Sequence, residues 1–281
     1  MACALILSSH VASSCVGGSV QALALAQFKI DPVLTPTVLY GRHPGWGEPG
    51  GGPVPIEVFE GMLEGVEANG LLARVDLVIT GYFASADQVR AAGRVIDVVR
   101  AAPRGDGARR PLIMVDPIMG DSGIGLYVPA EVSKALEAEL LQRADVVAPN
   151  AWELERLTGL SARDPASAVV AARRLGRPTL VSSVERGPDI GVVYADSSEA
   201  WLAAHVRAPA VPRGSGDLLT ALFAAALLEG QTPAYALSRA VGGVAETVYA
   251  AAAWEVSDLP VAAMGARIKI ASSDVRIEKL A

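Results

Sequence analysis

The chain has few of the residues that mark several common classes of protein. Two cysteines make a disulfide framework implausible, and three histidines without metal-ligand spacing give no zinc site, so we expect a protein of the reducing cytoplasm. The longest apolar run, residues 218–228, is too short to span a membrane, and the first residues lack the basic start of a signal peptide. The net charge of −6, without a basic stripe, argues against nucleic-acid binding. We therefore expect neither a membrane nor a nucleic acid as partner.

Short apolar segments alternate with segments of helical periodicity along most of the 281 residues. Strands are expected at residues 4–7, 33–39, 75–80, 112–115, 146–148 and 179–181. Helices are expected at residues 19–28, 56–69, 86–101, 130–141, 152–157, 165–175, 218–229 and 234–253. This alternation indicates βαβ units and a mostly parallel sheet covered by helices on both faces. Because no repeat or linker divides the chain, we predict a single α/β domain, residues 1–281.

Three segments depart from the alternation. Residues 190–195 and 199–204 predict a hairpin, and residues 261–270 form a last amphipathic segment. Residues 40–55 contain six glycines and four prolines and predict a long loop. Loops of this length are uncommon unless they are functional or disordered, so this loop is a candidate part of the site.

The sequence Arg213-Gly214-Ser215-Gly216-Asp217 joins a short extended run, residues 206–211, to an apolar helix. Glycines let a backbone approach a ligand closely, and the free N–H groups of a helix N-terminus favour a phosphate. Asp217 adds a carboxylate to the first turn. An anion cradle beside a carboxylate base suits phosphoryl transfer to a hydroxyl. The alternative is an ordinary glycine-rich turn in which Asp217 only stabilises the helix dipole.

Several residues with polar or small side chains fall at the ends of the expected strands. They are Ser9, Gly81, Tyr82, Asp116, Asn150 and Ser182. In an open α/β sheet, ligands bind outside the carboxyl ends of the strands, so we expect these residues to converge on one edge. The chain has no Walker A sequence and no G-x-G-x-x-G after the first strand, which leaves residues 214–217 as the candidate phosphate cradle.

An ordered set of short motifs resembles the pyridoxal kinases of the ribokinase-like superfamily. The motifs are Ser9-His10-Val11, Val16-Gly17, His43, Thr80-Gly81-Tyr82, Asp116-Pro117-Ile118-Met119-Gly120-Asp121, Tyr127-Val128-Pro129, Pro149-Asn150 with Glu153, Ser182-Ser183 and Gly214-Ser215-Gly216-Asp217. The resemblance covers about residues 4–255. It implies a three-layer αβα sandwich of the ribokinase-like type, a homodimer, and phosphorylation of pyridoxal by ATP.

The resemblance also implies roles for the residues at the reacting groups. Asp217 is expected to take the proton from the 5′-hydroxyl of pyridoxal as that hydroxyl attacks the γ-phosphate. The N–H groups of Gly214, Ser215 and Gly216 are expected to bind the charge that develops on the phosphoryl group. Asp116, Asp121 and Glu153 are expected to act around Mg²⁺, some of them through water.

The remaining implied contacts divide between the nucleotide and the vitamin. The expected nucleotide contacts are Asp116, Asn150, Glu153, Ser182, Ser183 and the cradle Gly214, Ser215 and Gly216. Ser9 is expected to bond the pyridine ring, and the other expected contacts to the vitamin are Val16, His43, Pro44, Gly45, Tyr82 and Asp217. The 40–55 loop is expected to fold over the substrate and exclude water.

Three positions, and the segment Ala12-Ser13-Ser14-Cys15, depart from the pattern of the family. Gly18 stands where an asparagine is usual, and Pro44 replaces a residue that is often threonine, so a backbone group of Gly45 is expected to replace the lost hydroxyl contact. Ala148 stands where a threonine helps to hold a monovalent cation, which leaves the use of K⁺ open. Two alternatives therefore stay open: a kinase for another small alcohol, such as hydroxymethylpyrimidine or a sugar, and a non-catalytic protein that binds a vitamer or a nucleotide.

Overall fold

The computed structural model describes residues 1–105, 109–208, 210–270 and 274–280. Its strands in the main sheet are β1 (Cys3–Val11), β2 (Asp31–Tyr40), β3 (Gly51–Pro53), β4 (Leu77–Thr80), β5 (Leu112–Val115), β8 (Val146–Val147), β9 (Thr179–Arg186), β10 (Asp189–Ala195), β11 (Ala200–Val206) and β12 (Arg276–Lys279). Within the described ranges the sheet has ten strands, in the order β12-β11-β10-β9-β8-β5-β4-β1-β2-β3. The strands from β9 to β2 are parallel, and β10, β11, β12 and β3 run antiparallel to their neighbours. The predicted α/β fold with a mostly parallel central sheet is confirmed.

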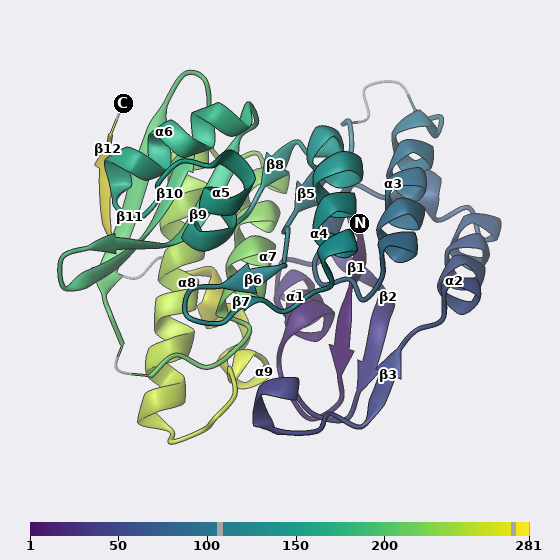
Figure 1. Cartoon of the computed structure of the whole chain (residues 1–281), viewed down its shortest axis with the longest axis horizontal. Coiled ribbons are helices and arrows are strands. Elements are labelled where there is room, and N and C mark those ends of the chain that lie inside the picture. The colour runs from purple at the N-terminus through teal and green to yellow at the C-terminus, as the bar shows by residue number, and fades with distance from the viewer. Residues whose placement is uncertain (106–108, 209, 271–273, 281) are drawn as a thin grey trace.

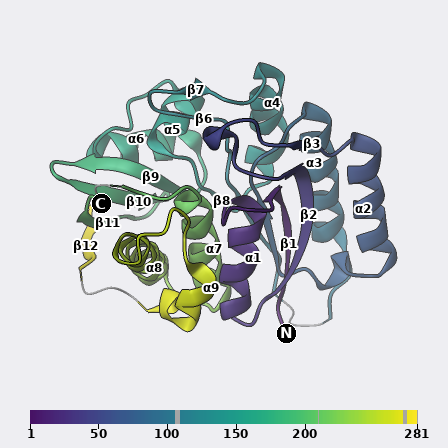
Figure 2. The ribbon, with the colours of Figure 1, turned by 90° about the horizontal axis from the view of Figure 1, so that it is seen from below.

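Helices cover both faces of the sheet, which makes three layers (Figures 1 and 2). One face carries α1 (Gly17–Gln27), α7 (Ser215–Leu228), α8 (Pro233–Ala253) and the short α9 (Val261–Met264). The other face carries α2 (Ile56–Ala68), α3 (Ala86–Ala101), α4 (Ala130–Ala135), α5 (Ala151–Thr158) and α6 (Pro165–Leu175). A separate two-stranded sheet, β6 (Gly120–Asp121) with β7 (Gly125–Leu126), lies near α5.

Strand β1 shows why the central strands are apolar without interruption. Ala4 and Ile6 belong to the core cluster under α1, α7 and α8, whereas Leu5 and Leu7 belong to the cluster under α2, α3 and α4. All four side chains are fully buried. Side chains alternate between the two faces of a strand, so a sheet covered on both faces needs apolar residues at every position.

Two strands continue beyond their predicted ends. β1 was expected to stop at residue 7, but it runs to Val11 with a bulge between Ser8 and His10. β9 was expected to stop at residue 181, but it runs to Arg186 and pairs with β10 in the predicted hairpin. The expectation that Ser9 and Ser182 follow their strands is therefore wrong, because both lie within them. Pairing with a neighbouring strand extends each polar stretch, and local sequence carries no signal of that pairing.

The loops and turns also differ in detail from the prediction. Residues 40–55 contain a 3₁₀ turn, Pro44–Trp46, and the edge strand β3. The helix predicted for residues 130–141 changes after α4 into a π turn, Leu136–Leu140, and then a 3₁₀ turn, Leu141–Arg143. Among the described residues of the run 206–211, Val206 alone belongs to a strand, and residue 209 lies outside the described ranges.

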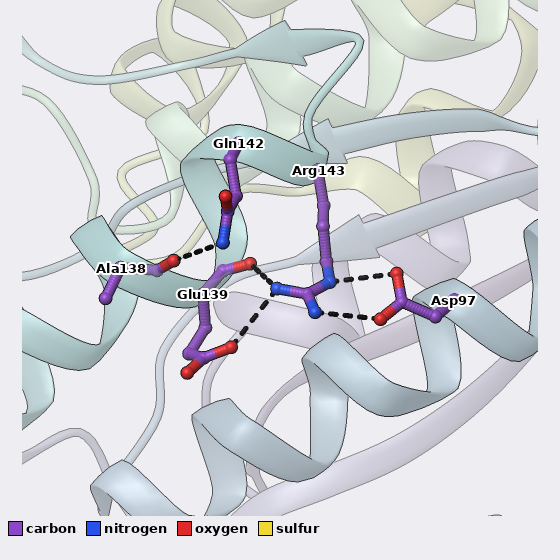
Figure 3. Close-up of polar contacts among 5 residues, drawn as sticks. All are labelled: Asp97, Ala138, Glu139, Gln142 and Arg143. Atoms are coloured by element: carbon purple, nitrogen blue, oxygen red, sulfur yellow. Dashed lines mark hydrogen bonds and ion pairs between the residues drawn. The ribbon is translucent and has the colours of Figure 1, made fainter.

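Arg143 joins the end of that irregular segment to α3 (Figure 3). Its guanidinium donates to both carboxylate oxygens of Asp97, at 2.9 and 2.8 Å, and to the carboxylate of Glu139 at 3.1 Å. The planar guanidinium matches the carboxylate as a fork, which favours this bidentate pair. Hydrogen bonding from Arg143 lowers the pKa of Asp97. The pair therefore fixes how α3 packs beside the irregular segment.

Both cysteines, Cys3 and Cys15, are free thiols. In the part of the chain that the structure describes, no helix has the length and apolar character that a membrane crossing requires.

Candidate active site

The order of the strands reverses beside β1. The chain passes from β1 through α1 to β2 on one side and later returns to β4 on the other side of β1. The loops that leave β1 and β4 therefore run in opposite directions, which is the arrangement that opens a ligand site in α/β sheets. The N-terminus of α7 packs against the loop after β1, because Gly214 lies against Cys15 and Val16. The N-terminus of α7 and the loop after β1 therefore lie side by side.

Asp217 stands in the first turn of α7 with its two carboxylate oxygens in different surroundings. The backbone N–H of Gly17 donates to Oδ2 at 3.0 Å. Oδ1 is shielded from solvent and has no hydrogen-bond partner among the residues that the structure describes. Burial raises the pKa of Asp217 to about 6. At neutral pH the side chain is therefore a carboxylate with one oriented oxygen and one free oxygen, as a general base requires.

Gly214 is required in the turn that leads into α7. Its φ of +88° lies in the left-handed region. A Cβ at this position would stand 2.6 Å from the carbonyl oxygen of Cys15 and 3.1 Å from the Cα of Val16. At Gly216, by contrast, an added Cβ would meet no atom within 4 Å, so the cradle is open on that side. The first N–H groups of a helix lack intrahelical acceptors and are free to bind an anion here.

Gly17 lies between Ser9 and Asp217, a role that its sequence motif does not predict. It has a φ of +57°, and a Cβ there would overlap the hydroxyl oxygen of Ser9. The same residue supplies the N–H that orients Asp217, so Ser9 and the base lie on either side of one glycine. The Val16-Gly17 pair was noted as part of a motif, but a backbone donor leaves no side chain from which its role can be read.

Asp116 follows β5 and is buried, with 6% of its surface exposed. Its Oδ2 accepts a hydrogen bond of 3.0 Å from the hydroxyl of Thr220, which lies on α7 one turn after Asp217. Burial, followed by the charges of Glu153 and Asp217, raises the pKa of Asp116. The negative charges of Glu153 and Asp217 therefore act on Asp116, and a cation bound at Asp116 would offset them.

Glu153 is held almost entirely by backbone groups. It accepts hydrogen bonds from the N–H groups of Met119 at 2.9 Å, Gly120 at 3.4 Å and Asn150 at 2.8 Å. Burial raises its pKa to about 7. Asp121, in contrast, is exposed on β6, where its Oδ1 accepts from the N–H of Ser122 at 2.6 Å. Glu153 is therefore buried with its carboxylate bound to backbone groups, whereas Asp121 lies at the surface.

These carboxylates fit a magnesium ion that arrives with a nucleotide. Among the described residues no group of three or more His, Cys, Asp or Glu side chains is spaced to hold a metal ion by itself. Magnesium in phosphoryl-transfer sites keeps several waters and takes one or two carboxylates together with phosphate oxygens. Asp116, with one oxygen engaged by Thr220 and the other left over, suits that role. Assignment of the ion to Asp116, Asp121 and Glu153 stays a prediction.

Asn150 connects two parts of the proposed nucleotide side. Its side chain caps α5 by accepting from the N–H of Glu153 at 2.8 Å, and it donates to the carbonyl of Gly120 at 2.9 Å. It also forms an isolated bridge with Ser182. The next residue, Ser183, is exposed with a φ of +62°, a strained conformation for a residue with a side chain. Ser182 therefore lies beside Asn150, and the contact of these residues with a nucleotide stays a prediction.

The expected vitamin contacts come from several segments. Ser9 and Val16 are buried beside the glycines that hold Asp217. The carbonyl of Tyr82 accepts from the hydroxyl of Thr37 at 2.6 Å, which fixes the backbone after β4. His43, Pro44 and Gly45 lie in the loop between β2 and β3, where the Gly45 N–H donates to Nδ1 of His43 at 2.9 Å.

Tyr127 is a second residue that the sequence analysis left without a role. Burial, followed by the charges of Glu153 and Asp116, raises the pKa of its phenol. The hydroxyl therefore stays protonated at neutral pH and can donate a hydrogen bond, although 45% of the residue is exposed.

The sequence of the chain is similar to those of known small-molecule kinases. A family model described as phosphomethylpyrimidine kinase matches residues 73–262. The chain is 35% identical over 243 residues to the pyridoxine/pyridoxal/pyridoxamine kinase of Bordetella avium, covering 84% of this chain and 79% of that protein. It is 30% identical to a pyridoxal kinase of Pseudomonas entomophila, covering 98% of this chain and 96% of that protein.

Solved structures agree with the curated relatives. A pyridoxal kinase from Leishmania donovani in complex with ADP and pyridoxine has a TM-score of 0.92 and 26% identity, with 99% of each chain covered. A pyridoxal kinase from Entamoeba histolytica has a TM-score of 0.89 and 25% identity, with 100% of each chain covered. The likeness therefore extends over the whole length of both chains.

Proposed function

This chain belongs to the pyridoxal kinase family, and we propose that it transfers the γ-phosphate of ATP to the 5′-hydroxyl of pyridoxal, giving pyridoxal 5′-phosphate and ADP. The observation that carries the proposal is Asp217, which has one oxygen fixed by Gly17 and one left free beside the N–H groups of α7. Relatives are named for pyridoxine, pyridoxal and pyridoxamine, so all three vitamers are candidate acceptors.

In the proposed reaction Asp217 receives the proton of the acceptor hydroxyl, and the hydroxyl oxygen receives the phosphoryl group. Its free Oδ1 accepts the hydroxyl proton while the hydroxyl oxygen forms a bond to the γ-phosphorus. The bond between the γ-phosphorus and the bridging oxygen breaks, and ADP leaves with that electron pair. The N–H groups of Gly214, Ser215 and Gly216 stabilise the charge on the transferring group.

The remaining residues bind and orient the two substrates. Asp116 would hold magnesium together with the ATP phosphates, and Glu153 and Asp121 would act through water. Magnesium, when bound, neutralises charge on the phosphate oxygens. Asn150, Ser182 and Ser183 contact the nucleotide, while Ser9 bonds the pyridine ring. Val16 and Tyr82 line the ring pocket, and His43, Pro44 and Gly45 cover it.

The direct test is an assay of the purified protein with MgATP and each of the three vitamers, in K⁺ and in Na⁺. Formation of a phosphorylated vitamer, identified by chromatography, is the expected result. Release of ADP with another alcohol, but with no vitamer, would show that the protein is a kinase whose acceptor is not a vitamer. Lack of turnover with every alcohol tested would favour a binding protein instead.

Hydroxymethylpyrimidine is a second candidate acceptor, and two observations favour it. The matching family model is described as phosphomethylpyrimidine kinase, and Pro44 removes a hydroxyl from the expected vitamin pocket. The assay above should therefore include hydroxymethylpyrimidine. A higher kcat/KM with it than with any vitamer would make it the substrate.

We also propose that the chain acts as a homodimer in the cytoplasm, as one kinase domain over residues 1–281. The dimer is supported by the family resemblance, and the cytoplasm by the low cysteine content. Sedimentation equilibrium at the working concentration tests the dimer, and a monomer mass would reject it.

A further inference from the structure

Residues 41–50 form the loop that connects β2 to β3, and hydrogen bonds fix its two ends. We refer to it as the 41–50 loop. Ser13, in the loop after β1, donates from its N–H and its hydroxyl to the carbonyl of Gly41, at 3.0 and 2.7 Å. The N–H of Arg42 donates to the carbonyl of Pro49 at 3.1 Å, which closes the loop on itself. These contacts fix where the loop starts and ends, but they leave its tip, Pro44–Trp46, to be placed by other groups.

The guanidinium of Arg213 lies against that tip. A Cβ added to Gly45 would stand 2.5 Å from Nη2, 2.6 Å from Cζ and 3.0 Å from Nε of Arg213. Gly45 has no positive φ, so its backbone conformation is open to any residue. A side chain at position 45 would therefore have to displace the guanidinium of Arg213.

Two further observations place the Arg213 charge between the loop and the cradle. Arg213 directly precedes Gly214, the residue that opens the turn into α7. Burial, and then the charge of Arg213, lowers the pKa of His43, whose Nδ1 must be unprotonated to accept from Gly45. Within the described ranges Arg213 forms no ion pair, so its charge is not committed to a carboxylate.

We propose that Arg213 is a positioning residue that holds the tip of the 41–50 loop against the N-terminus of α7, closing the loop over the acceptor alcohol. The inference rests on the proposed function, since the loop carries the expected vitamin contacts His43, Pro44 and Gly45. A closed tip orients the acceptor and keeps water from the γ-phosphate. Release of the tip raises the KM for the acceptor and permits hydrolysis of ATP by water.

The test compares Arg213→Gln, Gly45→Ala, the double variant and a control, Arg207→Gln. Arg207 is an exposed arginine shortly before Arg213, so its replacement makes the same change of charge away from the tip. Hydrogen exchange of peptides covering residues 41–50 reports on the loop directly. Kinetics report the acceptor KM, kcat, and the hydrolysis of ATP without acceptor.

Loss of the packing contact between Arg213 and Gly45 is expected to speed exchange of the loop, and to raise the acceptor KM, by about threefold or more in Arg213→Gln. kcat should change less than KM, hydrolysis of ATP should rise, and Arg207→Gln should match the wild type. Gly45→Ala should act by displacing the guanidinium, so it should add nothing to Arg213→Gln in the double variant.

Three results would overturn the inference. They are unchanged exchange of the loop in Arg213→Gln, additive effects in the double variant, and an equal effect of Arg207→Gln. If the wild type phosphorylates no vitamer, the proposed function fails, but the exchange measurements still decide whether Arg213 holds the loop.

Discussion

Burial of the Asp217 carboxylate destabilises the folded protein at neutral pH. Its pKa is about 6 in the folded state, against about 4 for an exposed aspartate. Between those two values the folded state keeps a proton that the unfolded chain has released, so stability falls as pH rises through this window. Well above pH 6 the whole penalty is present, on the order of 3 kcal/mol. A poised base and a stable fold are therefore in conflict at this residue.

Asp217→Asn should separate these two effects. The variant removes the base, so kcat should fall by roughly 10²–10⁴-fold, while binding of ATP stays close to the wild type. It also removes the buried charge, so the variant should be more stable than the wild type above about pH 6, with the advantage shrinking towards pH 4. Kinetics, nucleotide titration and thermal unfolding across pH measure the three effects. Retained turnover would refute the mechanism.

The activity of the wild type should report the same ionisation. Because Asp217 acts as a carboxylate, kcat/KM for the acceptor should fall as pH drops below about 6, towards a tenfold loss per pH unit. A pH–rate profile with an acceptor that does not titrate in this range measures it. An acid limb near pH 4 would show that the base is an exposed carboxylate.

Helix α7 connects the base to the carboxylate that is proposed to hold magnesium. Asp217 and Thr220 lie one turn apart on it, and the Thr220 hydroxyl donates to Asp116 at 3.0 Å. Both partners are buried, so the bond fixes which Asp116 oxygen is left for a ligand. The helix therefore sets the distance between the two halves of the site.

Thr220→Val should weaken the binding of MgATP while Asp217 stays in place. A lost hydrogen bond to a buried carboxylate is expected to raise the KM for MgATP by about tenfold or more. Thr220→Ser keeps the hydroxyl and should restore most of the affinity. Nucleotide titrations of both variants make the comparison, and an equal loss in Thr220→Ser would show that packing, rather than the hydrogen bond, is responsible.

The ion pair of Arg143 with Asp97 has a structural role remote from the site. Arg143→Gln should lower the free energy of unfolding by about 1 kcal/mol, since Asp97 is half exposed and solvent screens the pair. The pKa of Asp97 is lowered, so this contribution is present above about pH 4 and is lost as pH falls through the folded value. Urea unfolding at pH 7 and near pH 2 tests it. A difference that persists undiminished at the lower pH would exclude the ion pair as its source.

Elements with local start and stop signals were predicted to the residue. The helix at residues 165–175 begins after the capping residue Asp164 and ends at Gly176, which has a φ of +75°. β12, at the edge of the sheet, was missed, because all four of its residues are exposed and it forms by pairing with β11. Pairing between distant strands has no counterpart in local periodicity.

For the whole molecule, side chains were easier to predict than backbone groups. Asp116 and Asn150 were placed correctly at the ends of strands, because polar side chains after apolar runs are visible in the sequence. The hydrogen bond from the Gly17 N–H to Asp217 and the contact of Arg213 with Gly45 were not predicted. Both depend on how segments far apart in the sequence pack together. The candidate site was thus predictable in its composition but not in its internal contacts.

The hydrogen bond between Gly17 and Asp217 also determines when a refolding molecule becomes active. Its two partners are 200 residues apart in the sequence, so the base is oriented only after both ends of the chain have docked. Contacts of such separation form late, because closing a long loop costs entropy before the contact is gained. On dilution from denaturant, far-ultraviolet circular dichroism should therefore recover before catalytic turnover does. Simultaneous recovery would mean that the two ends meet early, and a molecule with most of its helices in place would then already be an enzyme.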